Sequence, residues 1–265
     1  MLPSQKTLKT EEAQALQKWS EKGGKLIIFE KGGMLEETEK FVFDVGTHFV
    51  SDSPFDFDFT VIDEVLKHEV VITPFVNYES GIRTKLTSGK PLAMIREPYF
   101  NRTYASYSSH RETPYKNTNS DYPAIVYNKN TIFFAHQIDQ LYYNHGMRIH
   151  RQLFDNAINY LNYKPVLQVN HLPSAGKVSL LHQKKQNRFV VHLLYSPPLL
   201  RANNVEVIED FVEIRNVNLE FRLDRPIQKV YQIPSGEELE FEFMEGLLKL
   251  KVPAFTMHTA IVLEY

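Results

Sequence analysis

The polar stretch at residues 96–114, REPYFNRTYASYSSHRETP, holds more groups able to do chemistry than any other part of this chain. It combines guanidinium, amide, hydroxyl, imidazole and phenol side chains, and it lacks the apolar rhythm of a helix or a strand. A loop of this length is longer than most connections in a compact domain and is usually either functional or disordered. Its aromatic residues argue against disorder. We therefore expect an ordered loop that carries the function.

Within and behind this loop we predict the residues that contact a ligand. Arginine and asparagine offer directional hydrogen-bond donors to hydroxyl groups, and tyrosine offers a stacking face. The candidates are Glu97, Tyr99, Asn101, Arg102, His110 and Arg111, with His136 and His150 behind them. In the alternative interpretation, Arg102 and Arg111 pair with local carboxylates and only hold the loop in place.

We predict no catalytic residue in this chain. Glycoside hydrolysis needs two carboxylates that face a sugar, and nothing in the sequence pairs Glu97 with a second acid. The nucleophile elbow G-x-S-x-G and the glycine-rich nucleotide motifs are absent. His145 and His150 are five residues apart with no acid between them, which differs from the helical zinc motif. We expect neither a metal nor a cofactor.

Composition excludes several classes of function. The chain has 265 residues, of which 43% are hydrophobic and 23% charged, as in soluble globular proteins. Its 30 basic and 32 acidic residues are spread along the chain, so nucleic acid is not an expected partner. No apolar run is long enough for a membrane helix and no signal peptide is evident, so we expect a cytoplasmic location. The absence of cysteine excludes a thiol nucleophile and thiolate metal sites.

The first half of the chain has the pattern of an α/β domain. Thr10 is predicted as the N-cap of a helix that ends at Gly23-Gly24, with Trp19 on its core side. An apolar strand follows at residues 25–29, and Leu2-Pro3 has the position of the preceding strand's tail. This is half of a βαβ unit. We expect either a small, edge-truncated α/β domain or the C-terminal part of a longer protein.

Further elements follow in this half. We predict a half-exposed strand at 55–59 from its strict alternation, strands at 70–75 and 91–95, and a helix at 149–161. Strands at 124–127 and 131–135 flank a tight hairpin turn at 128–130.

The pattern changes after Lys164-Pro165. Short β-branched or aromatic runs recur without a helical window, which is typical of a β-sandwich. The predicted strands are 166–169, 178–181, 189–195, 217–223, 229–233, 239–243, 247–252 and 256–263. We therefore predict two domains, an α/β domain at 1–164 and a β-sandwich at 165–265.

Several motifs resemble a known family. Leu2-Pro3 with KTEEAQALQKWSEKGGKLI at 9–27 is similar to the glutamine-amidotransferase-like domain that follows the catalytic barrel in family 42-type β-galactosidases and related uncharacterised glycoside hydrolases. EPYFNRTY at 97–104, SSH at 108–110 and YPAIVY at 122–127 are similar to the uncharacterised branch. RFVVHLLY at 188–195 with VIED at 207–210 resembles its trailing β-domain. The resemblance covers essentially the whole chain.

The resemblance implies a partial flavodoxin-like domain followed by an antiparallel β-sandwich. It places the catalytic acids on a preceding barrel that has no counterpart here, and it implies a domain that makes subunit contacts and can lend residues to a neighbour's active site. Amidotransferase activity would need a cysteine nucleophile, which this chain lacks.

We therefore expect a non-catalytic C-terminal region of a glycoside-hydrolase-like protein. It would act in oligomerisation, as a homo-oligomer or with a catalytic glycoside-hydrolase chain, and would shape a carbohydrate-binding cleft. Two alternatives stay open: a stand-alone glycoside hydrolase that uses Glu97 and a second carboxylate, and a purely structural interaction protein.

Overall fold

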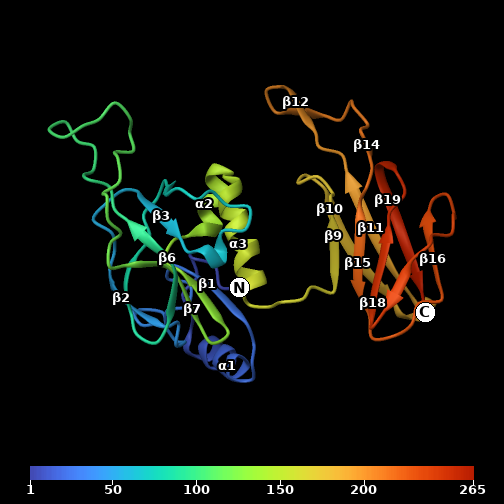
Figure 1. The fold of residues 1–265 in the computed structure, drawn as a ribbon, viewed down its shortest axis with the longest axis horizontal. Coiled ribbons are helices and arrows are strands. Elements are labelled where there is room, and N and C mark those ends of the chain that lie inside the picture. The colour runs from blue at the N-terminus through green and yellow to red at the C-terminus, as the bar shows by residue number, and fades with distance from the viewer. The chain divides into compact units, whose positions relative to one another are not determined.

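The computed structural model describes all 265 residues, and the chain divides into two compact units, Met1–Tyr163 and Lys164–Tyr265 (Figure 1). Strands are the main secondary structure of both, and all three α-helices belong to the first unit. No helix has both the length and the apolar composition needed to cross a membrane. Each unit has its own hydrophobic core.

The first unit is built on a six-stranded sheet with the order β1-β8-β7-β6-β3-β4. A second pair of strands, β2 and β5, forms a separate two-stranded sheet. The strands of the large sheet are β1 (Leu26–Phe29), β3 (Asp58–Ile62), β4 (Phe75–Asn77), β6 (Lys90–Arg96), β7 (Pro123–Asn128) and β8 (Thr131–Phe134), and those of the small one are β2 (Thr47–Ser51) and β5 (Arg83–Leu86).

The predicted half of a βαβ unit is present at the start of the chain. Leu2 bridges Ile28 in parallel, α1 (Thr10–Glu21) follows, and β1 then runs parallel to β8. The other neighbours in the large sheet pair in antiparallel fashion, including the predicted hairpin of β7 and β8. The sheet is therefore mixed, and a flavodoxin-like assignment of the whole unit stays a prediction.

Both faces of β1 and β8 are covered, which explains why their sequences are continuously apolar. On one face Phe29 contacts Phe134 and Phe154 of α3 (Arg148–Tyr160). On the other face Phe133 packs edge-on against Phe41. The helix predicted at 149–161 is thus confirmed as α3, whereas α2 (Ile138–His145) was not predicted.

Four local predictions for this unit were wrong. The half-exposed strand expected at 55–59 begins only at Asp58 and continues to Ile62 as β3, and it is mostly buried because β4 and β6 pair with it on its two sides. Lys9 rather than Thr10 is the N-cap residue of α1, because the Glu12 carboxylate accepts a hydrogen bond from the Lys9 amide at 3.1 Å. Trp19 is 48% exposed, since α1 packs shallowly and the indole lies over the backbone of Gly24. The strand expected at 70–75 is confined to Phe75 at the start of β4, because a turn with Glu69 at positive φ precedes it.

The second unit consists mainly of two antiparallel sheets around a common core, as the predicted β-sandwich requires. One sheet joins β10 (Lys177–Gln183), β11 (Arg188–Tyr195), β14 (Glu213–Ile214), β16 (Lys229–Ile233) and β19 (Phe255–Glu264). The other joins β9 (Leu167–Asn170), β15 (Asn218–Arg222), β17 (Glu242–Met244) and β18 (Leu247–Lys251).

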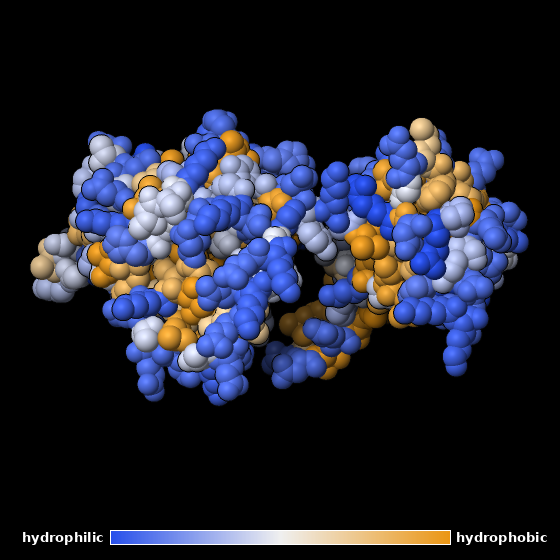
Figure 2. Space-filling view, turned by 90° about the horizontal axis from the view of Figure 1, so that it is seen from below, coloured by the Kyte–Doolittle hydropathy of each residue, from blue (hydrophilic) through white to orange (hydrophobic).

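One part of the second unit was not predicted. A hairpin of β12 (Leu199–Ala202) and β13 (Val205–Val207) forms a small sheet of its own. The space-filling view shows hydrophobic residues among the polar ones on this unit's surface (Figure 2). Its exposed apolar side chains include Leu200, Val205 and Phe211 near the hairpin.

The core of the first unit gives a stability prediction. Phe133→Ala should lower the free energy of unfolding by about 3–5 kcal/mol, because it removes a fully buried ring and leaves a cavity. Chemical denaturation followed by the fluorescence of Trp19, the single tryptophan, reports on this unit alone. Tyr143→Ala is the control, since Tyr143 is 83% exposed. Equal losses in the two variants would contradict the packing described here.

Candidate functional site

The base of the long polar loop is a short, ordered ladder. Pro98 and Tyr115 form an antiparallel bridge. The amide of Tyr99 donates to the carbonyl of Pro114 at 3.0 Å, and the amide of Lys116 donates to the carbonyl of Glu97 at 2.9 Å. The two ends of the loop are therefore held together directly after β6 ends.

Side chains lock this base onto the neighbouring segment. The Asn101 amide group donates to the carbonyl of Pro54 at 3.0 Å, and its oxygen accepts from the amide of Asp56 at 3.1 Å. The Thr113 hydroxyl donates to the carbonyl of Phe100 at 2.6 Å. Asn101, predicted as a ligand contact, thus has a structural role.

The tip of the loop projects into solvent. In Figure 1 this segment extends away from the body of the first unit. Tyr104 is fully exposed and Tyr107 is 73% exposed. Arg102 makes neither an ion pair nor a side-chain hydrogen bond, and Arg111 lies 4.0 Å from Glu112 with its own side chain in solvent. The alternative in which both arginines hold the loop through carboxylates is therefore not observed for Arg102.

Glu97 stands between two cations at the base of the loop. Its Oε2 atom accepts from Lys116 Nζ at 3.0 Å, and its Oε1 atom lies 3.6 Å from Arg83 Nε. The Arg83 side chain is almost fully buried, whereas that of Glu97 is 17% exposed. Glu97 therefore connects the surface of the loop to the interior.

The interior partner of this connection is a fully buried carboxylate, Asp58, on β3. Its Oδ2 atom accepts from Arg83 Nη1 at 3.0 Å and from the amide of Gly81 at 3.2 Å. Its Oδ1 atom accepts from His136 Nε2 at 2.6 Å and from Asn77 Nδ2 at 3.1 Å. Asn77 lies on β4, Arg83 on β5 and Gly81 between them, whereas His136 follows β8.

The electrostatics of this network keep Asp58 ionised. Burial by itself would raise the pKa of the carboxyl, but the charges and hydrogen bonds of His136 and Arg83 outweigh it, so the pKa lies below its usual value. Since an ionised carboxylate can only accept hydrogen bonds, His136 Nε2 carries the proton in this contact. The pair fixes the orientation of the imidazole.

The two histidines predicted behind the loop have different environments. His136 belongs to the Asp58 network and is linked through Arg83 to Glu97. His150 is fully buried on α3, packs against Phe75, and has no hydrogen bond at either ring nitrogen. Burial, together with the charges of His136 and His145, lowers the pKa of His150 to about 4.

The structure does not bring all predicted site residues together. Tyr99, Arg102, His110 and Arg111 lie along the exposed loop, whereas Glu97 and His136 join the buried network. His150 makes no hydrogen bond with either group. Sequence reasoning missed Asp58, Arg83 and Asn77. In the alternation FDFDF, Asp58 has the pattern of a solvent-facing residue, so only its partners on distant strands reveal its role.

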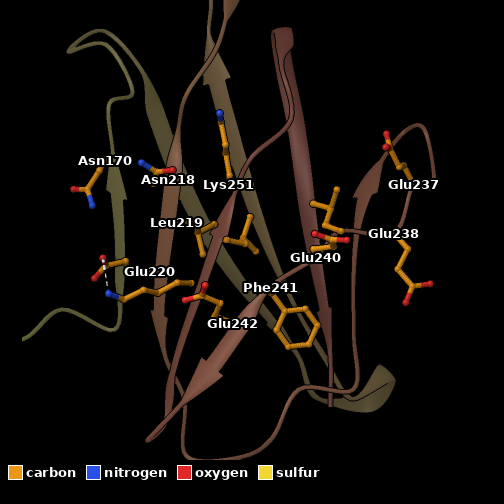
Figure 3. Close-up of a pocket in the computed structure, with 13 residues that line it drawn as sticks. Asn170, Asn218, Leu219, Glu220, Glu237, Glu238, Glu240, Phe241, Glu242 and Lys251 are labelled. Carbon is orange, nitrogen blue, oxygen red and sulfur yellow. Dashed lines mark ion pairs between the residues drawn. The ribbon is translucent and has the colours of Figure 1, made fainter.

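A second candidate region is a groove of about 820 Å³ in the second unit (Figure 3). It lies where residues 237–241 pass from β16 to β17. β17 pairs with β18 only as far as Lys249, so Leu250 and Lys251 have no partner strand on the side of the groove. Glu220 and Lys249 form an ion pair of 3.7 Å at its wall. Its other polar lining includes Asn170, Asn218, Glu237, Glu238, Glu240, Glu242 and Lys251. These side chains could hydrogen-bond a polyhydroxylated molecule, with Phe241 as an apolar contact.

The chain contains no cluster of three or more histidine, aspartate or glutamate side chains arranged to hold a metal ion.

The comparison with solved structures gives a strong match to one protein. Over its full length the chain superposes on α-L-fucosidase isoenzyme 2 from Paenibacillus thiaminolyticus, with a TM-score of 0.92 and 26% sequence identity. The chain spans 40% of the length of that fucosidase. No protein-family model matches the sequence, and neither does any curated protein.

Two further matches are more distant and concern the fold. A GH42 β-galactosidase from G. stearothermophilus gives a TM-score of 0.51 at 13% identity, with 97% of this chain and 30% of that chain covered. A β-galactosidase from Bacillus circulans sp. alkalophilus gives 0.53 at 11% identity, with 99% and 32% covered. The chain is therefore similar in structure to part of several glycoside-hydrolase chains, which agrees with the resemblance found in the sequence.

The Asp58 network predicts a large cost for one substitution. Asp58→Asn should lower the free energy of unfolding of the first unit by about 3–5 kcal/mol at pH 7, because it leaves Arg83 buried without its carboxylate. Asp56→Asn, in the same FDFDF motif but exposed, should change it little. Trp19 fluorescence during denaturation measures both. Because the pKa of Asp58 is lowered in the folded state, its contribution should disappear as the pH falls through that pKa.

His150 predicts a different pH dependence. Its pKa is about 4 when folded and about 6.5 when unfolded, so the unfolded chain binds more protons between these values and stability falls as the pH drops through this window. His150→Phe should remove this loss, so its free energy of unfolding should rise relative to that of the wild type by about 2–3 kcal/mol as the pH is lowered from 7.5 to 4.5. A constant difference between the two proteins across this range would show that His150 is not buried in its neutral form.

Proposed function

We propose that this chain is a non-catalytic region, C-terminal to a catalytic barrel, of a glycoside-hydrolase-type protein. The observation that carries the proposal is the full-length superposition on part of an α-L-fucosidase at 26% identity. Catalysis would then take place elsewhere, in the same protein or in a partner chain.

The surroundings of Glu97 support a non-catalytic role. Both of its oxygens face cations, and the nearest acid of its network, Asp58, is fully buried and bound to four donors. A glycosidase acid needs access to the sugar and a second carboxylate on the opposite side of the glycosidic bond. The pairing of Glu97 with Arg83 and Lys116 instead supports its use as an anchor of the loop.

The exposed loop is the proposed contact surface. Arg102, His110 and Arg111 present donors to solvent, and Tyr99, Tyr104 and Tyr107 present aromatic rings. Such groups can bind sugar hydroxyls and stack on a sugar ring, or they can contact another subunit. We propose that the loop helps to complete a carbohydrate-binding cleft and that the protein self-associates. L-Fucosides are the first sugars to test, because the similar solved structure is an α-L-fucosidase.

The first unit is proposed to be a partial amidotransferase-like domain. The parallel arrangement of Leu2, β1 and β8, with α1 between the first two, supports this assignment. The antiparallel strands from β7 to β4 would be additions to that parallel part.

A thermal-shift experiment tests the loop as a binding site. L-Fucose at ten times its Kd should stabilise the wild type by about 1.4 kcal/mol, which raises Tm by about 3–6 °C. Arg102→Ala should lose this shift without a change in the Tm of the free protein, because the exposed Arg102 side chain makes neither an ion pair nor a hydrogen bond within the chain. Lys18→Ala, an exposed cation on α1, should keep the shift.

Three results would contradict parts of this proposal. The absence of a shift with L-fucose, D-galactose or their disaccharides would remove the carbohydrate role. A shift retained in Arg102→Ala would place the sugar away from the loop. Turnover of an aryl fucoside by the purified chain that disappears in Glu97→Gln would make the chain an enzyme in its own right.

A further inference from the structure

The strand β10 forms an open edge of the second unit. It pairs with β11 on one side only, over seven consecutive residues and without a bulge. The backbone groups of β10 that face away from β11 make no hydrogen bond. A row of unpaired N–H and C=O groups on a regular strand is a template for pairing with another strand.

Exposed apolar side chains stand on both faces of this edge. Leu180 is 36% exposed and Val178 43%, and they lie beside Val191 and Leu193 of the sandwich core. On the opposite face Leu181 is 47% exposed beside Val190. The apolar core of the sandwich therefore extends to β10, where its outermost side chains are exposed to solvent.

The usual protections of an edge strand are absent from β10. Natural edges are guarded by proline, by bulges or by charges placed along the strand. The sequence KVSLLHQ has no proline and no acid, and its one lysine, Lys177, stands at the first position. The free edge is thus suited to a specific neighbour.

We propose that β10 pairs with β10 of a second copy of this chain, in antiparallel orientation about a two-fold axis at Leu180. The two five-stranded sheets would then form one continuous sheet. This inference deepens the self-association that the proposed function includes, and it uses a surface distinct from the loop at 96–114.

The register follows from symmetry. A two-fold axis perpendicular to the joined sheet keeps the same face of both copies on the same side. Because directly opposite residues of an antiparallel pair point to the same face, the residue at the axis must lie opposite the same residue of the other copy. The axis at Leu180 pairs all seven residues, whereas any other axis pairs fewer. Opposite neighbours would be Lys177 with Gln183, Val178 with His182 and Ser179 with Leu181. No like charges meet, and Leu180 of each copy would cover its counterpart.

Cysteine cross-linking tests this register directly, because the natural chain has no cysteine. Residues opposite each other in an antiparallel pair have Cα atoms about 4.5–5.5 Å apart, within the range of a disulfide. Leu180→Cys should therefore give a disulfide-linked dimer under mild oxidation. Lys177→Cys is the matched control on the same strand. Its two copies would be about 20 Å apart and should stay unlinked.

Charge substitutions test the same contact in solution. Leu180→Lys and Leu180→Glu each place like charges at the axis and should give monomers by sedimentation, with unchanged circular dichroism. Mixing the two variants should restore a dimer, because the opposite charges then face each other.

The results separate this inference from the proposed function. A monomeric wild type would overturn the pairing of β10, and a sugar-dependent thermal shift would still support the loop as a binding site. A wild-type oligomer that persists in both charge variants would place self-association on another surface and would likewise overturn the pairing. Equal cross-linking of the two cysteine variants would overturn the register.

Discussion

A carboxylate that is removed from water stays ionised only where donors replace the solvent, and the first unit is organised around one such group. Asp58 gathers Arg83, His136, Asn77 and the amide of Gly81 from separate segments. These partners leave little freedom for the strands that supply them. Gly81 illustrates the constraint, because a Cβ atom there would lie 2.9 Å from the ring of His136.

The same network reaches the surface through one ionic contact. Arg83 is held by Asp58 on one side and approaches Glu97 on the other, and Glu97 in turn binds Lys116 at the opposite end of the loop. The rigidity of the interior is thereby transmitted to the base of an otherwise solvent-exposed segment. A loop with an ordered base has less conformational entropy to lose in any contact, which agrees with the contact role proposed for this one.

Patterns within single segments predicted the local elements well. Apolar runs identified β1 and the hairpin of β7 and β8, an apolar helical side identified α3, and short β-branched or aromatic runs after Pro165 indicated the sandwich-like unit. Trp19 and Asp58 were misplaced because their environments depend on contacts that no local pattern records, with the backbone of Gly24 in one case and with Arg83 and His136 in the other. The direction of strand pairing is a further such property, since β1 and β8 pair across about a hundred intervening residues.

The closed base of the loop separates a tip that tolerates change from an interior that does not. The ladder at Pro98 and Tyr115 joins the two ends of the loop. The segment between Asn101 and Glu112 can therefore become longer or shorter at little cost in stability, since each doubling of a flexible loop costs about 0.6 kcal/mol of closure entropy. The sequence and length of the tip can therefore vary while the base that holds it stays the same. A substitution or insertion at the tip would change this surface without altering the interior that supports it.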